Sequence, residues 1–220
     1  MIKALAIPMA TLLLGHSQLE IKLDLYQGGD KVGFGSYKES TDRKGHRTRE
    51  MKLWAKDDAQ TKIRVFSTKV VDTNAYPISE EEQFDQESSS IRTSIVWRVR
   101  YDRSGNAIVT EYKDHQLKTE HTFPPIPGYS RADASDLWFS KVVPQPGTRA
   151  MSTVFDIEHA KWQVVETTFV GRRWITVSGR QIEANEVRDI RDGNVRNVFL
   201  DDKGQPVLMK NGPLRTEKRF

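Results

Sequence analysis

The sequence predicts an all-β protein whose single domain is a large, curved antiparallel sheet, a half-barrel or open barrel of about eleven strands, with one short helix. Apolar and polar residues alternate with a period of two over most of the chain from Glu20 onward, which is typical of strands with one buried face. Turn sequences that contain glycine separate these runs, and almost no segment with a helical period lies between them. Antiparallel neighbours need only short turns, whereas parallel strands would need long crossovers.

The composition is that of an ordinary folded protein. Its 220 residues are 37% hydrophobic and 29% charged, which excludes a collagen, a coiled coil, a largely disordered chain and a polytopic membrane protein. The chain has no cysteine. Disulfides, thiolate nucleophiles, cysteine-bound zinc and iron–sulfur clusters are therefore excluded.

Residues 1–17 have the pattern of a secretory signal peptide. Lys3 supplies a positive charge, residues 4–15 are uncharged and mostly apolar, and Gly15 and Ser17 place small residues just before the cleavage site. The apolar run has 12 residues, well short of the ~20 that span a membrane as a helix. The alternative, a buried first strand or helix, is disfavoured by the missing alternation. We expect a periplasmic or extracellular mature chain, residues 18–220, without a transmembrane segment.

The charge of the mature chain is small and scattered. Cleavage removes one lysine and no acidic residue, so the net charge falls from +4 to +3, which does not indicate a nucleic acid partner. The basic stretch of residues 43–52 is interpreted as a water-facing loop, with a phosphate-binding patch as the alternative. The acidic stretch of residues 80–87 is interpreted as a solvated loop or a short helix, since Ser79 and Glu82 have the spacing of a capping box.

The strands are predicted from the alternation and from the turns between them. Alternation is clearest in residues 20–25, 51–56 and 95–101. Weaker alternation predicts strands over residues 63–71, 108–112, 117–123, 152–157, 162–170, 174–177, 195–200 and 207–209. The turn sequences Ser104-Gly105, Asp192-Gly193 and Asp202-Lys203-Gly204 supply the positive φ angles that tight hairpins need.

Four glycines, Gly28, Gly29, Gly33 and Gly35, superficially resemble a phosphate-binding loop. Such a loop leads into a helix and carries a lysine followed by serine or threonine, whereas this cluster joins two extended segments. We therefore predict a hairpin turn. Gly33 and Gly35, inside a strand, indicate a bend or the close approach of another backbone.

Residues 124–150 interrupt the pattern of strands. The segment is rich in proline and glycine and contains a predicted short helix over residues 131–141, with Ser130 as its N-cap. It is either a linker between two halves, residues 18–123 and 151–220, or a lid that packs on the sheet. Three adjacent large apolar residues, 137–139, favour packing.

Neither a catalytic residue nor a metal site is predicted. His115 and His121 could share one face of a strand, but six residues at ~3.3 Å each separate them by ~20 Å, too far for one metal ion. No Gly-x-Ser-x-Gly motif is present. We also expect no cofactor.

Tryptophan and phenylalanine residues are spread over nearly every predicted strand. In a chain without disulfides, such residues mainly build the core, but a curved sheet could instead use them to enclose an apolar ligand. For the second case, the predicted lining residues are Trp97, Trp138, Phe139, Trp162 and Trp174.

Several motifs follow one another in the C-terminal half: Pro146-Gly147, Val170-Gly171, Ile175 to Gly179, and Phe199 to Val207; the turn after Tyr26, with Val32-Gly33, opens the N-terminal half. This pattern resembles secreted bacterial β-proteins of unknown function, which are distantly similar to the half-barrels that carry lipoproteins across the periplasm. The resemblance implies an envelope location and a curved antiparallel sheet. It transfers no catalytic residue.

The leading hypothesis is a noncatalytic protein that binds an apolar small molecule, a lipid or an envelope component in the concave face of the sheet. One alternative is a hydrolase whose paired carboxylates come from Asp156, Glu158 or Glu166. Another is a structural or interaction module of the envelope, which an exposed edge strand or a large apolar patch would indicate.

Overall fold

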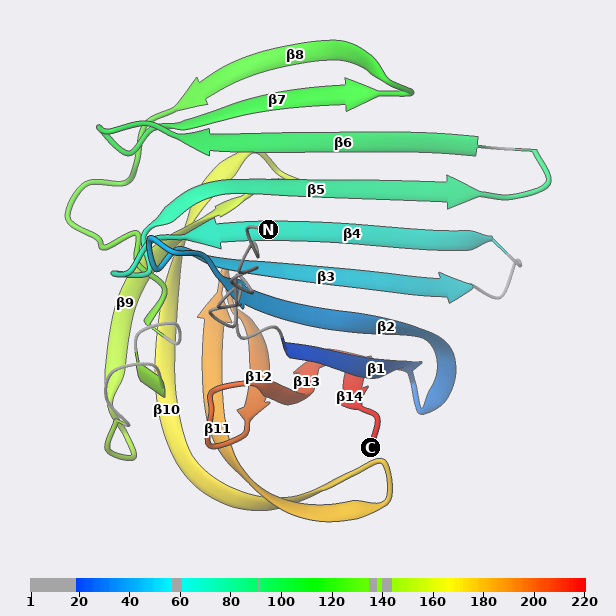
Figure 1. Cartoon of the computed structure of the whole chain (residues 1–220), viewed down its shortest axis with the longest axis vertical. Helices are drawn as coiled ribbons and strands as arrows, with labels where there is room; N and C mark the ends of the chain where they lie inside the picture. Colours follow the sequence, from blue (N-terminus) through cyan, green and yellow to red (C-terminus); the bar gives the residue numbers. More distant parts are fainter. Residues whose placement is uncertain (1–18, 57–60, 91, 135–137, 140–143) are drawn as a thin grey trace, which may run out of the picture.

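A computed structural model describes residues 19–56, 61–90, 92–134, 138–139 and 144–220 of the chain. The predicted signal peptide, residues 1–17, lies outside the described residues. One antiparallel sheet contains all fourteen strands, in the order β8-β7-β6-β5-β4-β3-β2-β1-β14-β13-β12-β11-β10-β9 (Figure 1). The strands are β1 (Leu19–Gln27), β2 (Asp30–Thr41), β3 (Arg47–Lys56), β4 (Lys62–Val71), β5 (Pro77–Glu87), β6 (Arg92–Tyr101), β7 (Ala107–Lys113), β8 (Gln116–Phe123), β9 (Arg149–Asp156), β10 (Lys161–Val177), β11 (Arg180–Arg191), β12 (Asn194–Leu200), β13 (Pro206–Asn211) and β14 (Leu214–Lys218).

The predicted fold class, a large and curved antiparallel sheet that does not close into a barrel, is confirmed, but the predicted number of strands is too low. Two predicted strands, residues 162–170 and 174–177, are parts of the single strand β10, which continues through a bulge at Gly171. At Gly171 the φ angle is 128°, a value that favours glycine. Alternation did not predict four strands, β2, β5, β11 and β14, although the glycine pattern already placed Gly33 and Gly35 of β2 inside a strand.

The interpretation of the acidic stretch as a loop or helix is wrong, because residues 80–87 lie within β5. Cross-strand partners make the acidic residues compatible with a strand. Glu80 lies 3.5 Å from the Lys69 ammonium group and accepts a 2.9 Å hydrogen bond from the Tyr101 hydroxyl. Glu81 accepts a 2.7 Å hydrogen bond from Arg98.

The interpretation of the basic stretch as a loop holds only up to His46, since β3 begins at Arg47. Within β3, the Arg49 guanidinium lies 3.3 Å from the carboxylate of Glu39 on β2. Alternating side chains of β3 point to opposite faces of the sheet, so the charges of this stretch are divided between the two faces.

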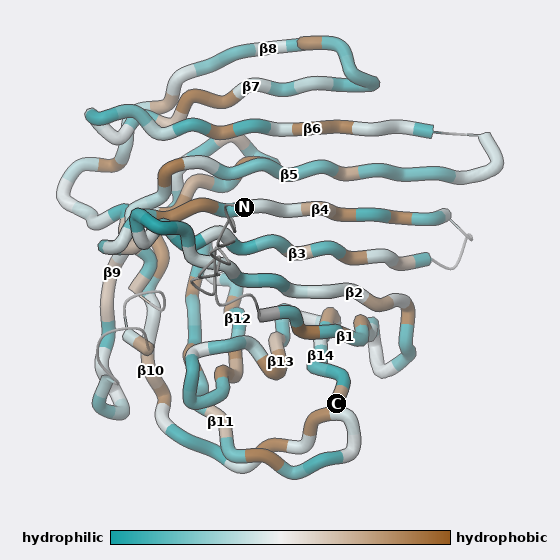
Figure 2. Tube along the Cα trace, viewed as in Figure 1, coloured by the Kyte–Doolittle hydropathy of each residue, from teal (hydrophilic) through white to brown (hydrophobic). Residues whose placement is uncertain are grey.

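Each face of the sheet is defined by residues that pair directly across neighbouring strands. One such row runs through Tyr37, Met51, Ser67, Glu82 and Trp97. We call the face that carries this row the inner face, because it faces the hollow of the curved sheet. Figure 2 shows hydrophobic and hydrophilic residues alternating along several strands, as a sheet with two different faces requires.

The sheet is continuous between the N-terminal and C-terminal strands, because β1 pairs with β14. The side chains of Asp24 on β1 and Arg219 after β14 also form an ion pair. Lys31 adds a second contact to Asp24 at 2.8 Å. The two predicted halves of the domain therefore belong to one sheet rather than to two packed sheets.

The two edge strands, β8 and β9, do not pair with each other, but the ends of the sheet overlap. Val99, Ala107 and Val109 on β6 and β7 pack against Phe155 and Ile157 at the end of β9; we call this group the edge cluster. Trp162 joins it and donates a 3.2 Å hydrogen bond to the carbonyl of Phe123.

In the edge cluster, the outer face of one end of the sheet meets the inner face of the other end. Trp162 and Thr167 are five residues apart on β10, with no bulge between them, so they lie on opposite faces. Thr167 lies on the inner face of β10, where it pairs with Asp189 of β11. The outer face of β9 and β10 therefore packs against the inner face of β6 and β7, and β10 passes behind β5 and β6 in Figure 1.

The segment between β8 and β9 packs on the sheet, as the lid interpretation predicts. Trp138 and Phe139 pack against Phe169, Val187 and Leu200 on the inner face of β10 to β12. The predicted start of the helix at Arg131 is wrong, because residues 131–133 are not helical and Ser130 pairs with Ser152 of β9. Ala134, Trp138 and Phe139 have helical backbone conformation, and residues 135–137 and 140–141 lie outside the described residues. The Thr153 amide donates a 2.7 Å hydrogen bond to the carbonyl of Ser130, which ties the segment to β9.

Four hairpins share one loop design, in which an aspartate begins a five-residue loop. The aspartate carboxylate accepts the amide of the residue four positions later, and the residue three positions later adopts a positive φ angle. The loops are residues 42–46, 72–76, 102–106 and 201–205, and their positive-φ residues are Gly45, Ala75, Gly105 and Gly204. The predicted turns at Gly105, Gly193 and Gly204 are confirmed, as is the hairpin at Gly28 and Gly29.

The predicted close approach at the strand glycines is also confirmed. A Cβ atom at Gly33 would collide with the carbonyl of Trp54, and one at Gly35 with the carbonyl of Lys52. Both glycines lie on β2 next to β3, so this pair of strands tolerates no side chain at either position.

Candidate functional site

The inner face of the curved sheet encloses a cavity of about 270 Å³ between β2–β4 and β11–β13, which we call the inner cavity. From β2 to β4, its wall includes Tyr37, Met51 and Ser67. From β11 to β13, it includes Val187, Asp189, Arg191, Arg196, Val198 and Met209. Residues more than one hundred positions apart therefore meet at one site.

One wall of the inner cavity is apolar. Val187, Val198 and Met209 lie directly opposite one another on β11, β12 and β13. Leu200 extends this wall, and Val187 and Leu200 are both buried. Phe139 packs against Val187 and Leu200 on the same inner face, next to Gly204. The wall is rigid, because each of its residues is held by strand pairing and by side-chain packing.

The cationic side chains of the inner cavity are mostly paired with acidic ones. Arg49 lies 3.3 Å from Glu39, and Lys69 lies 3.5 Å from Glu80. These two pairs belong to β2–β5, on the side of the cavity opposite the apolar wall.

Asp189 is buried on β11 and holds a third cation. Its Oδ1 accepts a 2.9 Å hydrogen bond from the Thr167 hydroxyl, and its Oδ2 accepts a 3.1 Å hydrogen bond from Nε of Arg196. Both carboxylate oxygens of Asp189 are therefore engaged. Such a buried and fully bonded ion pair keeps its geometry.

Arg191 differs from the other cations of the inner cavity. Its Nε is buried and has no hydrogen-bond partner in the described part of the chain. Burial lowers the pKa of the Arg191 guanidinium, and the positive charge of Arg196 lowers it further. Asp189, Asp133 and Asp156 act in the opposite direction, but no ion pair joins any of them to Arg191 among the described residues.

Glu82 is the inner-face acid whose ionisation is most affected by the fold. Burial raises the pKa of the Glu82 carboxyl, and the negative charges of Glu158, Glu80 and Asp156 raise it further. The row position of Glu82, between Ser67 and Trp97, places it where β5 faces the opposite end of the sheet.

The five aromatic residues predicted to line the concave face lie in three different environments. Trp97 and Trp162 pack in the edge cluster. Trp138 and Phe139 pack against the apolar wall on the inner face, at Phe169, Val187 and Leu200. Trp174 is 72% exposed and lies far along β10, so it lines no part of the inner cavity. A ligand contact by the other four residues stays a prediction.

The three acids of the hydrolase alternative do not converge in the structure. Asp156 pairs with Lys161 across β9 and β10, and Glu166 lies five residues beyond Lys161 on the same strand, so Asp156 and Glu166 lie on opposite faces. Glu158 is exposed in the turn between these strands. Asp156 is engaged by Gln163 at 2.8 Å, and Glu166 lies 3.5 Å from Arg149.

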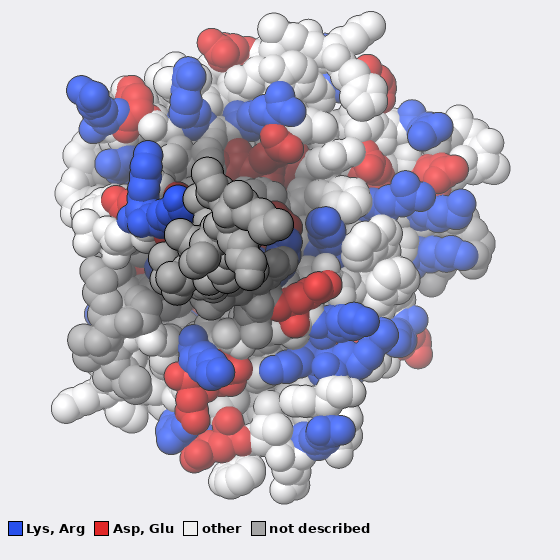
Figure 3. Space-filling view, viewed as in Figure 1, with Lys and Arg blue, Asp and Glu red and all other residues white. Residues whose placement is uncertain are grey.

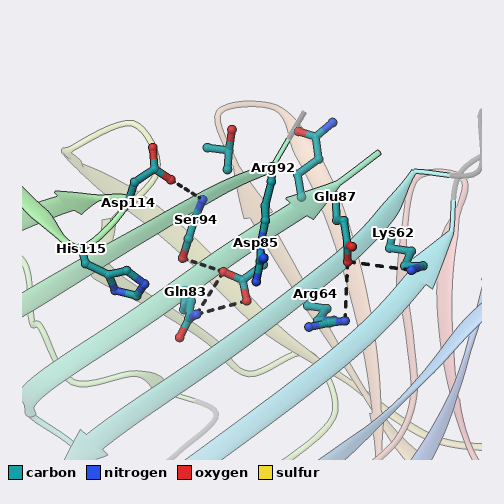
Figure 4. A pocket seen from close by; sticks show the side chains of 11 residues that line it. Lys62, Arg64, Gln83, Asp85, Glu87, Arg92, Ser94, Asp114 and His115 are labelled. Atoms are coloured by element: carbon teal, nitrogen blue, oxygen red, sulfur yellow. Dashed lines mark hydrogen bonds and ion pairs between the residues drawn. The ribbon is translucent and has the colours of Figure 1, made fainter. Parts of the chain in front are cut away.

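A second pocket, of about 320 Å³, lies between the ends of β4 to β6 and the turn before β8 (Figure 4). Its polar groups already bond to one another. Asp85 accepts hydrogen bonds from Gln83 and from the Ser94 hydroxyl, and the Glu87 carboxylate lies 3.9 Å from both Lys62 and Arg64. This pocket has neither an apolar wall like that of the inner cavity nor a cation like Arg191, whose Nε is buried without a partner among the described residues.

The outer surface has the two features that an interaction module would need. Phe34, 53% exposed, stacks on Trp54 with a centroid distance of 5.3 Å. The edge strand β8 is exposed along nearly its whole length, but the charge of Lys118 and the bulge at this residue oppose pairing with another strand. Neither feature lies at the inner cavity.

Acidic and basic side chains are interspersed on the face shown in Figure 3, in agreement with the small net charge. Within the described ranges, no three histidine, aspartate or glutamate side chains come close enough to hold a metal ion. No helix in the part of the chain that the structure describes combines the length and hydropathy of a membrane-spanning helix.

Sequence reasoning did not single out Arg191 or its neighbours. The signal was present, because the alternation in residues 187–191 places Val187, Asp189 and Arg191 on one face of a strand. Asp189 and Arg191 follow Val187 on this face, just before a tight turn, and so mark a polar site on the inner face. The row could not be recognised because β11 itself was not predicted.

Comparison with known proteins supports the fold. No protein-family model matches the chain, and no curated protein matches it. The structure is similar to the crystal structure of a β-barrel-like protein, of the domain of unknown function DUF1849, from Brucella abortus, with a TM-score of 0.58. The two chains are 10% identical, and the similarity covers 91% of this chain and 94% of the other. At this identity the match bears on the fold alone, and the likeness to lipoprotein carriers stays an expectation from the sequence.

Proposed function

We propose that this protein is a noncatalytic binding protein of the bacterial envelope, which holds an apolar small molecule or the chain of a lipid in its inner cavity. The observation that carries the proposal is the apolar wall formed by Val187, Val198, Leu200 and Met209. The predicted signal peptide supports the location. A β-barrel-like fold is compatible with binding, because curved sheets can enclose ligands.

The size of the inner cavity suits a small ligand or one end of a chain. Its volume of about 270 Å³ lies near the lower end of the range of ligand pockets, about 300–1,000 Å³. Apolar contact would supply the affinity, at about 25 cal/mol for each Å² of apolar surface removed from water.

The test compares two valines on the same strand. Val198 lies in the wall of the inner cavity, whereas Val195 lies on the other face of β12 and is 45% exposed. The neutral apolar dye N-phenyl-1-naphthylamine is the probe, and its fluorescence measures binding. Val198→Gln should weaken binding about tenfold, since burial of a valine contributes about 1.5–3 kcal/mol. Val195→Gln should leave binding unchanged.

Two results would contradict the proposal. The first is the absence of saturable binding of the dye by the wild-type protein. The second is an equal loss of binding in both variants, which would place the dye outside the inner cavity. Mass spectrometry of organic extracts from the purified protein would show whether a lipid is retained from the cell.

A further inference from the structure

Arg191 is the starting point, because it is the one cation of the inner cavity that no described carboxylate contacts. Arg49, Lys69 and Arg196 each lie within 4 Å of a carboxylate oxygen. Arg191 lines the same cavity, and no ion pair involves it among the described residues.

The nearest acid on the same strand cannot serve as a partner. Asp189 already bonds to Thr167 through Oδ1 and to Arg196 through Oδ2. The Nε of Arg191 is buried without an acceptor. The Arg191 side chain is half-buried and its Nε is buried, so the guanidinium has lost part of its water without gaining a bonded anion, which is unfavourable. An anion from outside the chain would remove this imbalance.

The position of Arg191 relative to the apolar wall restricts the class of ligand. Val187 and Arg191 are four residues apart on one face of β11, so their Cα atoms lie about 13 Å apart. A ligand that reaches both needs a charged end and an apolar end. The carboxylates of Asp133 and Asp156 partly offset the positive charge near Arg191, which favours one negative charge over several.

We infer that Arg191 binds the headgroup of a singly charged anionic amphiphile, a carboxylate or a phosphate ester, whose chain lies against Val187, Val198 and Met209. The guanidinium presents parallel N–H donors that match the two oxygens of such a headgroup. The inference rests on the proposed function and specifies the ligand of the same cavity.

The experiment uses probes with one tail and different heads, each below its micellar concentration. Isothermal titration calorimetry at pH 7.5 measures the affinities for dodecanoate, dodecyl methyl phosphate and dodecanol; the second is a phosphodiester and carries one negative charge, whereas a phosphate monoester would carry nearly two. The wild-type protein should bind one of the two anions at least about tenfold more tightly than the alcohol. Tighter binding of dodecanoate would indicate a fatty acid, and tighter binding of dodecyl methyl phosphate would indicate a phospholipid headgroup.

Two variants separate a direct contact from a general effect of charge. Arg191→Met should lower the affinity for the preferred anion about tenfold and leave dodecanol unchanged. Arg188→Met is the matched control, because Arg188 lies on the same strand, is exposed and carries the same charge. It should bind all three probes like the wild type. Arg191→Lys keeps the charge without the paired donors, so it should show an intermediate loss, and it decides the question if Arg191→Met does not fold.

The outcomes distinguish this inference from the proposed function. Equal losses in the variants at positions 188 and 191, or equal affinities for alcohol and anions in the wild type, would overturn the headgroup site and leave the apolar cavity intact. If none of the three probes bound, the proposed function would fail, and the headgroup site with it.

Discussion

Phe155 should be essential for the overlap of the two ends of the sheet. Its side chain is 5% exposed, and its ring lies 5.4 Å from the ring of Phe123 and 5.3 Å from that of Trp162. No hydrogen-bonded ladder joins β8 to β9. The packing of side chains in the edge cluster is therefore the main interaction that holds β6 and β7 against β9.

The decrease in the free energy of unfolding expected for Phe155→Ala follows from the burial of this ring. Replacement of a buried phenylalanine by alanine costs about 3–5 kcal/mol, from lost transfer free energy and from the remaining cavity. We expect the upper part of this range for Phe155→Ala, because its aromatic neighbours come from other strands and would have to move to refill the space. For a chain of this size, the loss corresponds to a decrease in Tm of roughly 10 °C.

The assay is urea denaturation followed by far-UV circular dichroism. Met151→Ala is the matched control, since Met151 lies on the same strand and face as Phe155 but is 47% exposed. This control should change the free energy of unfolding by less than about 0.5 kcal/mol. A decrease in the free energy of unfolding of less than about 1 kcal/mol for Phe155→Ala, or equal decreases in both variants, would refute the conclusion that the edge cluster holds the two ends of the sheet together.

Three further predictions concern a turn and two carboxylates. Gly105→Ala should lower the free energy of unfolding by about 1–2 kcal/mol in thermal denaturation, because the φ angle is 84°, a conformation that is strained for a residue with a Cβ atom. Glu82→Gln should stabilise the protein at neutral pH. Because the pKa of Glu82 is raised in the folded protein, its carboxyl contributes to stability at low pH, and this contribution is lost as the pH rises above the usual pKa of a glutamate. In urea denaturation, the free energy of unfolding of the variant should therefore decrease less steeply over this pH range than that of the wild type. Asp24→Asn should have the opposite dependence. Arg219 lowers the pKa of Asp24, so the stabilisation is present at neutral pH and is lost as pH falls through the acidic range, and the wild type and the variant should converge in acid.

Much of the local structure could be predicted from the sequence. Alternation placed ten of the strands, and glycine positions placed the turns at Gly105, Gly193 and Gly204. The four missed strands have local features that hide alternation. In β2, Gly33 and Gly35 occupy inner-face positions where apolar side chains would be expected, and in β5 consecutive acidic residues occupy both faces.

The repeated loop that begins with aspartate was a signal that could have located more of the hairpins. Asp42, Asp72, Asp102 and Asp201 each precede a positive-φ residue by three positions. The loop at Asp72 shows why the pattern is hard to see, since Ala75 replaces the expected glycine and adopts a φ angle of 63°. Its sequence therefore lacks the glycine on which turn prediction depends.

The candidate site was less accessible to prediction than the fold. Aromatic residues were the natural choice for a lining, yet Trp97 and Trp162 pack in the edge cluster, and valine, leucine and methionine form the apolar wall of the inner cavity. Large rings pack well between overlapping layers, where they bury the most surface. The number of aromatic residues in a sequence does not show whether they pack between the overlapping ends of the sheet or line the inner cavity.

By itself, the sequence determined which segments are extended and where the chain turns, because side-chain alternation and backbone conformation depend on residues close together in the chain. Only the tertiary structure decided that β1 joins β14, that the ends of the sheet overlap, and that Arg191 faces the inner cavity without a partner among the residues that the structure describes. These features depend on pairings between distant residues, such as Asp24 with Arg219, 195 positions apart. The curvature of the whole sheet, which no local pattern encodes, sets which residues meet.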